Sequence, residues 1–275
     1  MDIQELSLVL VTLAYVISAG AYAANFHAKS ELRGNIATRG LVLGWVLHTF
    51  LLGRLTVAGA GVPLTNEVLP SLCAWLVVIV YLYLELTTRD RSLGALVVPI
   101  VTLLQLFTLI KLMALGEVPP VAFAGSWFKL HVLAYIGAYA AFAISCVSAV
   151  MYVLLLGEIQ AKHLGFFYER LPPLETLDQI NNRAVTFGFL FLIAGLIASS
   201  AWAYQELERL WVWNEPAFAA LLVTCFVYAC HLGARLIAGW RGKRSAFLSI
   251  IGFALVVLSF PVVGVLFSGR HSLGP

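Results

Sequence analysis

The chain has 275 residues, of which 61% are hydrophobic and only 11% are charged, and its mean hydropathy is +0.93. This composition lies far outside that of soluble proteins and leaves no stretch from which a soluble domain could be built. The net charge of +3 gives little information until the basic residues are mapped, and no nucleic-acid partner is expected. We therefore expect an all-α, polytopic membrane protein.

Crossing a bilayer takes about 20 consecutive apolar residues. Runs of this kind predict a single transmembrane domain, residues 1–275, built as a bundle of eight helices. We do not expect the first run to be a cleavable signal peptide, because Asp2 and Glu5 replace the basic start of such a peptide. After Pro172 and Pro173, amphipathic spacing predicts a further short helix on the membrane face. The eight predicted spans are 6–26, 37–59, 69–87, 93–115, 128–156, 183–203, 217–239 and 245–267.

The basic residues follow alternate predicted helices, the first, third, fifth and seventh. Lys and Arg gather in cytoplasmic connections, so the pattern places both termini and the loops 60–68, 116–127 and 202–216 outside. A bacterial inner membrane is the expected location. The residues that carry this pattern are Lys29, Arg33, Arg39, Arg89, Arg91, Lys162, Arg170, Arg183, Arg235, Arg241, Lys243 and Arg244.

Residues 202–216 form a short polar and aromatic segment between two apolar runs, here called the Trp-rich segment. It holds three of the seven tryptophans, Trp202, Trp211 and Trp213. An ordinary interfacial aromatic belt accounts for such residues. The same density of indole rings would also suit a stacking platform for a large planar ligand, and the segment alone does not decide between the two.

The predicted topology sorts the histidines into layers. His48 and His231 lie about 16 and 21 Å below the outer surface, at 1.5 Å per helical residue, and so share a layer within the membrane. His131 and His271 both lie at the outer surface, beside the Trp-rich segment. The remaining two, His27 and His163, fall on the cytoplasmic side and are expected to be incidental.

Two pairs of histidines without accompanying carboxylates or thiolates favour an iron that takes one imidazole on each side. Heme fits this pattern better than zinc, which normally has four protein ligands, or three and a water. Arg54, Lys111 and Lys129 lie in the outer third of the membrane, where they could neutralise heme propionates or simply extend toward lipid headgroups. A hydrogen bond between helices for His48, and a proton-coupled transporter using these histidines, remain the alternatives.

The four cysteines, Cys73, Cys146, Cys225 and Cys230, all fall within predicted spans and form no C-x-x-C pair. They are expected to be small buried apolar residues, which disfavours thiol–disulfide or metal–thiolate chemistry.

The residues themselves suggest a family. The run from Trp202 to Asn214 resembles the external motif of the cytochrome c assembly proteins, the CcsA/CcmC-type heme-handling family, which reads approximately W-A-N-E-A-W-G-x-x-W-x-W-D. The motif matches without a gap at Trp202, Ala203, Trp211 and Trp213. Shorter similarities occur at 63–66 (PLTN), 127–132 (WFKLHV), 171–178 (LPPLETLD), 239–244 (GWRGKR) and 270–272 (RHS).

This resemblance implies specific ligands. In the family two external histidines flank the motif and hold heme for delivery to apocytochrome c, and the matching positions are His131 and His271. His231 matches a membrane heme ligand of the CcsA branch, and depth suggests His48 as its partner. Heme b is the implied cofactor, with apocytochrome c and a partner membrane protein as further partners. No catalytic residue is implied, so the chain would be at most part of a heme-attachment system.

Two departures from the motif leave a second branch open. Leu207 and Glu208 replace Trp-Gly, and Asn214 replaces the final Asp. Glycine there would let the backbone approach a porphyrin, whereas a glutamate would crowd it. The HemX-like branch of the same superfamily has this length and is associated with regulating heme biosynthesis through glutamyl-tRNA reductase. For that role the connection 157–182 would supply the cytoplasmic surface.

Overall fold

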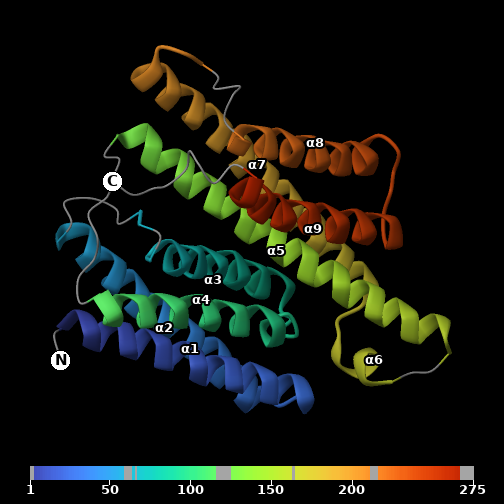
Figure 1. The fold of residues 1–275 in the computed structure, drawn as a ribbon. Helices are drawn as coiled ribbons and strands as arrows, with labels where there is room; N and C mark the ends of the chain where they lie inside the picture. The colour runs from blue at the N-terminus through green and yellow to red at the C-terminus, as the bar shows by residue number, and fades with distance from the viewer. Residues whose placement is uncertain are drawn as a thin grey trace. The chain divides into compact units, whose positions relative to one another are not determined.

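The computed structural model describes residues 3–58, 64–65, 67–115, 125–162, 165–210 and 216–266, and these are helical with no strand among them. The all-α prediction is therefore confirmed (Figure 1). The helices are α1 (Ile3–His27), α2 (Glu31–Ala58), α3 (Leu69–Thr88), α4 (Gly94–Leu115), α5 (Ser126–Gln160), α6 (Phe166–Arg170), α7 (Leu174–Leu207), α8 (Pro216–Leu236) and α9 (Lys243–Leu266).

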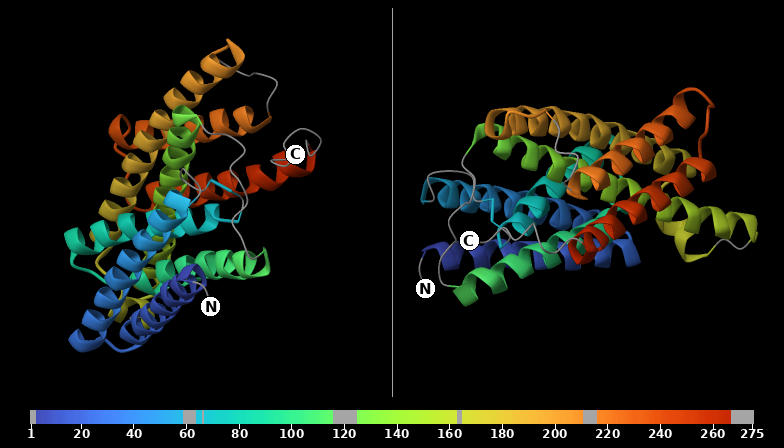
Figure 2. Two further views of the ribbon diagram at one scale, coloured as in Figure 1. Left: turned by 90° about the vertical axis from the view of Figure 1, so that its left-hand side faces the viewer. Right: turned by 45° about the horizontal axis from the view of Figure 1, so that its top comes forward.

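The chain forms two compact units. The first unit comprises Met1–Val121 and Lys162–Pro172, and the second comprises Ala122–Ala161 and Pro173–Pro275. In the first unit α1 packs along both α2 and α4, and α3 packs against α4 and α2. In the second unit α5 and α7 run along each other, while α9 packs against α5 and α8 (Figures 1 and 2). Each cluster of contacting side chains described in the next subsection lies within one unit.

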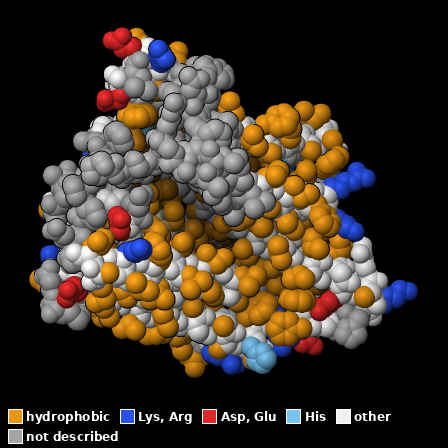
Figure 3. All heavy atoms as spheres, in the orientation of Figure 1, with side chains coloured by type: hydrophobic (Ala, Val, Ile, Leu, Met, Phe, Trp, Pro, Cys, Tyr) orange, Lys and Arg blue, Asp and Glu red, His pale blue; other side chains and the backbone are white. Residues whose placement is uncertain are grey.

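Six helices within the described residues, α1 to α5 and α7, are long and apolar enough to cross a membrane. The described apolar part of α8, Ala220–Leu236, is shorter. Large apolar side chains face outward, such as Leu103 at 65% and Ile110 at 60% exposure on α4, and hydrophobic side chains cover much of the described surface in Figure 3. The chain is thus a multi-pass membrane protein. The eight-span count, the single domain and the outward termini stay predictions.

Helix α7 begins nine residues earlier than the predicted span. Pro173 stands at its N-cap, and Leu174–Leu207 is one continuous helix. The separate short helix expected after the two prolines is therefore wrong, because that segment forms the first turns of α7. A short helix does occur, but it is α6, which precedes the prolines. Counting apolar residues missed this extension since its exposed face is polar.

Small residues let α5 and α7 approach closely in the second unit. A Cβ atom at Gly188 would collide with the ring of Phe142, and one at Gly195 would collide with the ring of Tyr135. Phe142 stacks in turn on Tyr228 of α8, with ring centroids 3.4 Å apart and planes at 4°. These aromatic contacts make the core of the unit, which positions the polar residues described next.

Candidate functional site

An aromatic cluster surrounds His131 in the second unit. Its imidazole centroid lies 4.9 Å from the Phe128 ring, 5.6 Å from Tyr135 and 5.8 Å from Trp202. Phe128 and Trp202 also touch each other, with centroids 5.6 Å apart. The first turns of α5 supply His131, Phe128 and Tyr135, and the last turns of α7 supply Trp202. The structure thus brings His131 beside the start of the Trp-rich segment.

The His131 imidazole has few polar neighbours. Its Nδ1 atom is buried and has no hydrogen-bond partner of good geometry among the described residues, although the Trp127 backbone one turn earlier lies near the ring. Lys129 is half-buried on the same turn of α5, and Trp127 is 38% exposed. The other predicted members of this site, Trp211, Trp213, Asn214 and His271, lie outside the described residues.

His231 lies in a second cluster of polar side chains in the second unit and is 1% exposed. Its Nε2 atom lies 3.2 Å from Ser245 Oγ, and its Nδ1 atom lies 3.5 Å from Ser249 Oγ, both on α9. Ser249 in turn donates to the Asn181 side-chain oxygen of α7 at 2.7 Å, as does Ser145 of α5 at 2.6 Å. Four helices therefore meet around His231 through hydroxyl and amide groups.

An ion pair between Arg235 and Asp178 lies beside this cluster, because Arg235 also contacts Ser245 at 3.4 Å. The terminal guanidinium nitrogens of Arg235, Nη1 and Nη2, donate to the Asp178 carboxylate at 3.0 and 2.7 Å, and the Gly242 backbone N–H donates to it at 3.0 Å. The Arg235 and Asp178 side chains are only 12% and 13% exposed. Gly242 has a φ of +62°, which glycine adopts without strain. Asp178 thereby fastens α7 to α8 and to the turn before α9.

His48 lies in the first unit and is fully buried. Its Nδ1 atom is 2.9 Å from the Tyr15 hydroxyl, and its Nε2 atom is 2.7 Å from Ser71 Oγ. Ser71 donates in turn to the Gln105 side-chain oxygen at 2.7 Å. The interhelical hydrogen bond considered for His48 is therefore present. His48 and His231 belong to different units, and their pairing stays a prediction.

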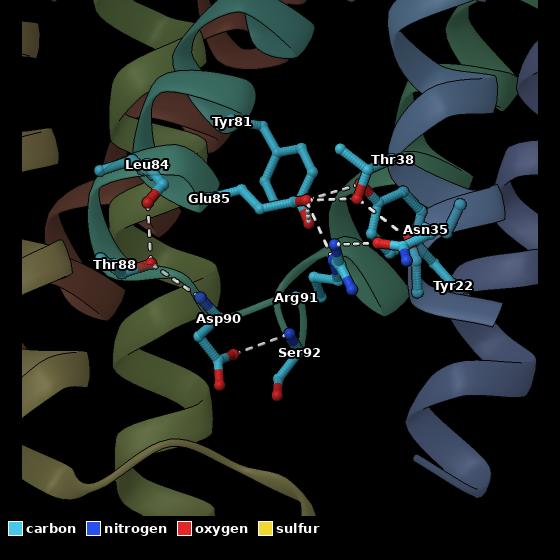
Figure 4. A network of polar contacts seen from close by, with 12 residues as sticks. Tyr22, Asn35, Thr38, Tyr81, Leu84, Glu85, Thr88, Asp90, Arg91 and Ser92 are labelled. Carbon is cyan, nitrogen blue, oxygen red and sulfur yellow. Dashed lines mark hydrogen bonds and ion pairs between the residues drawn. The ribbon is translucent and has the colours of Figure 1, made fainter. Parts of the chain in front are cut away.

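A buried carboxylate that the sequence analysis did not single out lies elsewhere in the first unit. Glu85 is 5% exposed and accepts hydrogen bonds from Tyr22 at 2.5 Å, Thr38 at 2.5 Å and Tyr81 at 2.6 Å. Figure 4 shows these side chains converging on it, with Arg91 Nε 3.5 Å away. An acidic residue within a predicted span was the signal that could have found it.

The cations proposed for heme propionates are less constrained. Arg54 is exposed on α2, and Lys111 is exposed on α4 with its ammonium 5.7 Å from the Phe107 ring. Neither is placed at a site by a described contact.

Comparison with known proteins identifies the family. A sequence model described as "Cytochrome C assembly protein" matches residues 66–271. The chain belongs to the cytochrome c assembly protein family. Its relatives include proteins named "Cytochrome c biogenesis protein CcsA". That of Guillardia theta is 30% identical, with 85% of this chain and 83% of the relative covered. That of Synechococcus elongatus is 26% identical, with 87% of each chain covered.

Two sequence similarities to this family have a shared structural basis here. The LPPLETLD run ends in Asp178, and the GWRGKR run contains Gly242, whose N–H donates to that carboxylate. The Asp178 side chain thus holds together two segments whose contacting residues are 64 positions apart in sequence.

Glu208, which stands where the family motif has glycine, lies at the end of α7. Glu208 ends α7 with a φ of +53°, in the left-handed region, and its N–H bonds to the Tyr204 carbonyl. Helices often end on a glycine in this conformation, because a Cβ atom is strained there. The glycine of the family motif therefore suits the end of α7, beyond any role in approaching a porphyrin.

Proposed function

We propose that this protein binds heme at the outer face of the inner membrane and presents it to apocytochrome c during cytochrome c biogenesis. The proposal rests on the surroundings of the His131 imidazole. No described side chain forms a hydrogen bond to its buried Nδ1 atom, and the ring packs against Phe128 and Trp202. Apolar rings offer a flat surface for a porphyrin, and a neutral imidazole is a common axial ligand of heme iron.

The remaining members of the outer site are proposed from the family resemblance. His271 would be the second axial ligand, while Trp211, Trp213 and Asn214 would extend the stacking surface. Lys129, half-buried on the same helical turn as His131, is proposed to neutralise a propionate, with Arg54 as a second cation. Attachment of heme to the cysteine thiols of apocytochrome c requires mainly that the thiols and the heme vinyl groups be held together. We propose that a partner membrane protein helps to hold them and completes the system.

His48 and His231 are proposed as the ligands of a second heme, heme b, within the membrane. Both residues are imidazoles, a common kind of axial ligand for heme iron, and both are buried. Each ring nitrogen, however, has a hydroxyl within hydrogen-bonding distance, at 2.7 and 2.9 Å for His48 and at 3.2 and 3.5 Å for His231. Ligation at either residue therefore requires a hydroxyl to leave.

Complementation of a deletion strain tests the outer site. His131→Ala should abolish maturation of c-type cytochromes, measured by heme staining of membrane and periplasmic fractions. His27→Ala is the matched control, since that side chain is exposed at the end of α1 and outside the cluster. Normal maturation with His131→Ala would refute the proposal. Unaltered cytochromes with a changed abundance of glutamyl-tRNA reductase in the deletion strain would instead support a regulatory role.

A further inference from the structure

The turn that joins α8 to α9 carries a concentration of positive charge. Arg241, Lys243 and Arg244 stand within four positions of one another, and all three side chains are exposed. None of them forms an ion pair with an acidic side chain of the described residues. Figure 3 shows basic side chains projecting at this end of α8 and α9. We call residues 239–244 the basic turn.

The carboxylate that lies beside the basic turn does not neutralise it. Asp178 interacts electrostatically with Arg241, but its two oxygens accept the hydrogen bonds of Arg235 and of the Gly242 N–H. The Arg235–Asp178 pair is therefore close to neutral as a whole. The first turn of α9 contains no acidic residue, and its first two residues are both basic, although a helix dipole disfavours cations there. The charge of the basic turn thus has no counter-charge among the described residues.

The backbone of the basic turn has a defined shape. Gly239 and Gly242 have φ values of +65° and +62°, which glycine adopts without strain. The Trp240 N–H donates to the Ala234 carbonyl at 3.0 Å, and the Gly242 N–H donates to Asp178 at 3.0 Å. These bonds fasten the turn to the ends of α8 and α7, so its three cations are held close together.

Aromatic rings accompany two of these cations. The Arg244 guanidinium lies 5.6 Å from the ring centroid of Trp240, and the Lys243 ammonium lies 6.0 Å from that of Phe247. Trp240 is 37% exposed. Tryptophan favours the headgroup level of a membrane, and a cation over its ring is attracted to it. Both cations are therefore expected at the depth where lipid phosphates lie.

The end of α8 adds an apolar surface directly beside the charge. Leu236 and Ile237, which precede the basic turn, are 81% and 90% exposed. A free phosphate ion would satisfy the cations and leave these two side chains without an apolar neighbour. A molecule that carries both a negative headgroup and hydrocarbon chains satisfies both surfaces at once.

We propose that the basic turn binds the headgroup phosphate of an anionic phospholipid whose acyl chains contact Leu236 and Ile237. Arg241 and Arg244 supply planar guanidinium groups that can hold phosphate through two parallel hydrogen bonds, and Lys243 adds a third positive charge. This inference is independent of heme binding, because none of these residues belongs to the proposed heme sites.

Native mass spectrometry of the full chain in detergent tests the assignment by counting bound lipids. Wild-type protein should bind dioleoyl phosphatidylglycerol with a lower Kd than the zwitterionic dioleoyl phosphatidylcholine. Arg244→Gln should raise the Kd for phosphatidylglycerol about fivefold, the factor expected for one basic residue near an anionic membrane surface. The triple variant Arg241→Gln, Lys243→Gln and Arg244→Gln should bind the two lipids equally.

A second triple variant is the matched control. Lys29→Gln, Arg39→Gln and Arg89→Gln removes the same number of exposed cations from the first unit. It should keep the wild-type preference for phosphatidylglycerol. Glycerol 3-phosphate, which has the phosphate without acyl chains, should not bind detectably.

Each other outcome would overturn the proposal. Equal Kd values for the two lipids in the wild type, or an unchanged preference in the first triple variant, would show that the basic turn does not select anionic lipid. An equal loss of preference in the control would assign the effect to net charge instead of to the turn. Glycerol 3-phosphate binding as tightly as the lipid would identify a soluble phosphate ester as the ligand.

Discussion

The buried carboxylate of Glu85 offers a direct test of how the first unit is held together. Three hydroxyls from three helices, those of Tyr22, Thr38 and Tyr81, donate to it, and Arg91 lies 3.5 Å from one of its oxygens. Glu85→Ala removes the shared acceptor and leaves the donors buried or half-buried without it. The Tyr22 and Tyr81 side chains are 0% and 1% exposed, so water cannot readily replace the carboxylate.

The expected cost follows from two bounds. Removing one partner of a buried charged pair typically costs about 3 to 5 kcal/mol. Polar contacts between membrane helices average only about 0.6 kcal/mol each, so the two from Tyr22 and Thr38 sum to about 1.2 kcal/mol. We therefore expect Glu85→Ala to lower the free energy of unfolding by about 3 kcal/mol, which corresponds to a Tm lower by roughly 6 to 12 °C.

Thermal unfolding in detergent, followed by circular dichroism, measures this loss. Glu169→Ala is the control, because Glu169 also pairs with an arginine of the first unit, Arg170 at 3.2 Å, but is 69% exposed. An exposed pair of this kind contributes at most about 1 kcal/mol. Equal melting temperatures for the two variants would show that the Glu85 contacts do not stabilise the unit.

Three further predictions concern single positions. Glu208→Gly should stabilise the protein by about 1 kcal/mol in thermal unfolding, because the position has a φ of +53°, and a lower Tm would contradict this account of the end of α7. Gly94→Ala should destabilise it by about 2 kcal/mol, since a Cβ there would collide with Tyr22 and Tyr81; an unchanged Tm would show that these rings can move. Asp178→Ala should cost about 3 kcal/mol, and adding Arg235→Leu should restore part of this by removing the unpaired buried charge. A double variant less stable than Asp178→Ala would refute the assignment.

The helices that could be predicted from the sequence are those marked by a long run of apolar residues. The runs that gave α1 and α3 to α5 were placed within a few residues of their observed bounds, because any buried or lipid-facing helix needs such a run. The start of α7 was missed because its first turns carry polar residues such as Asp178, which hydropathy assigns to a loop. Pro173 at the N-cap was the local signal that marked the true start.

Some contacts of the candidate site residues could also be predicted from the sequence, and others could not. His131 and Trp202 could be placed together because the predicted topology puts the start of α5 and the end of α7 on one side of the membrane, and the structure has the two side chains in contact. The partners of His48 could not be predicted, since Tyr15, Ser71 and Gln105 each stand alone in an apolar run on a different helix. Only packing determines which isolated polar groups meet, and periodicity carries no information on that pairing.

The absorption spectrum of protein purified in detergent from a heme-replete host tests the central claim, that the chain binds heme through His131, most directly. We predict a Soret band that decreases in His131→Ala and keeps its intensity in His27→Ala. A chain purified without any Soret band, or a band of equal intensity in wild type and His131→Ala, would contradict the account.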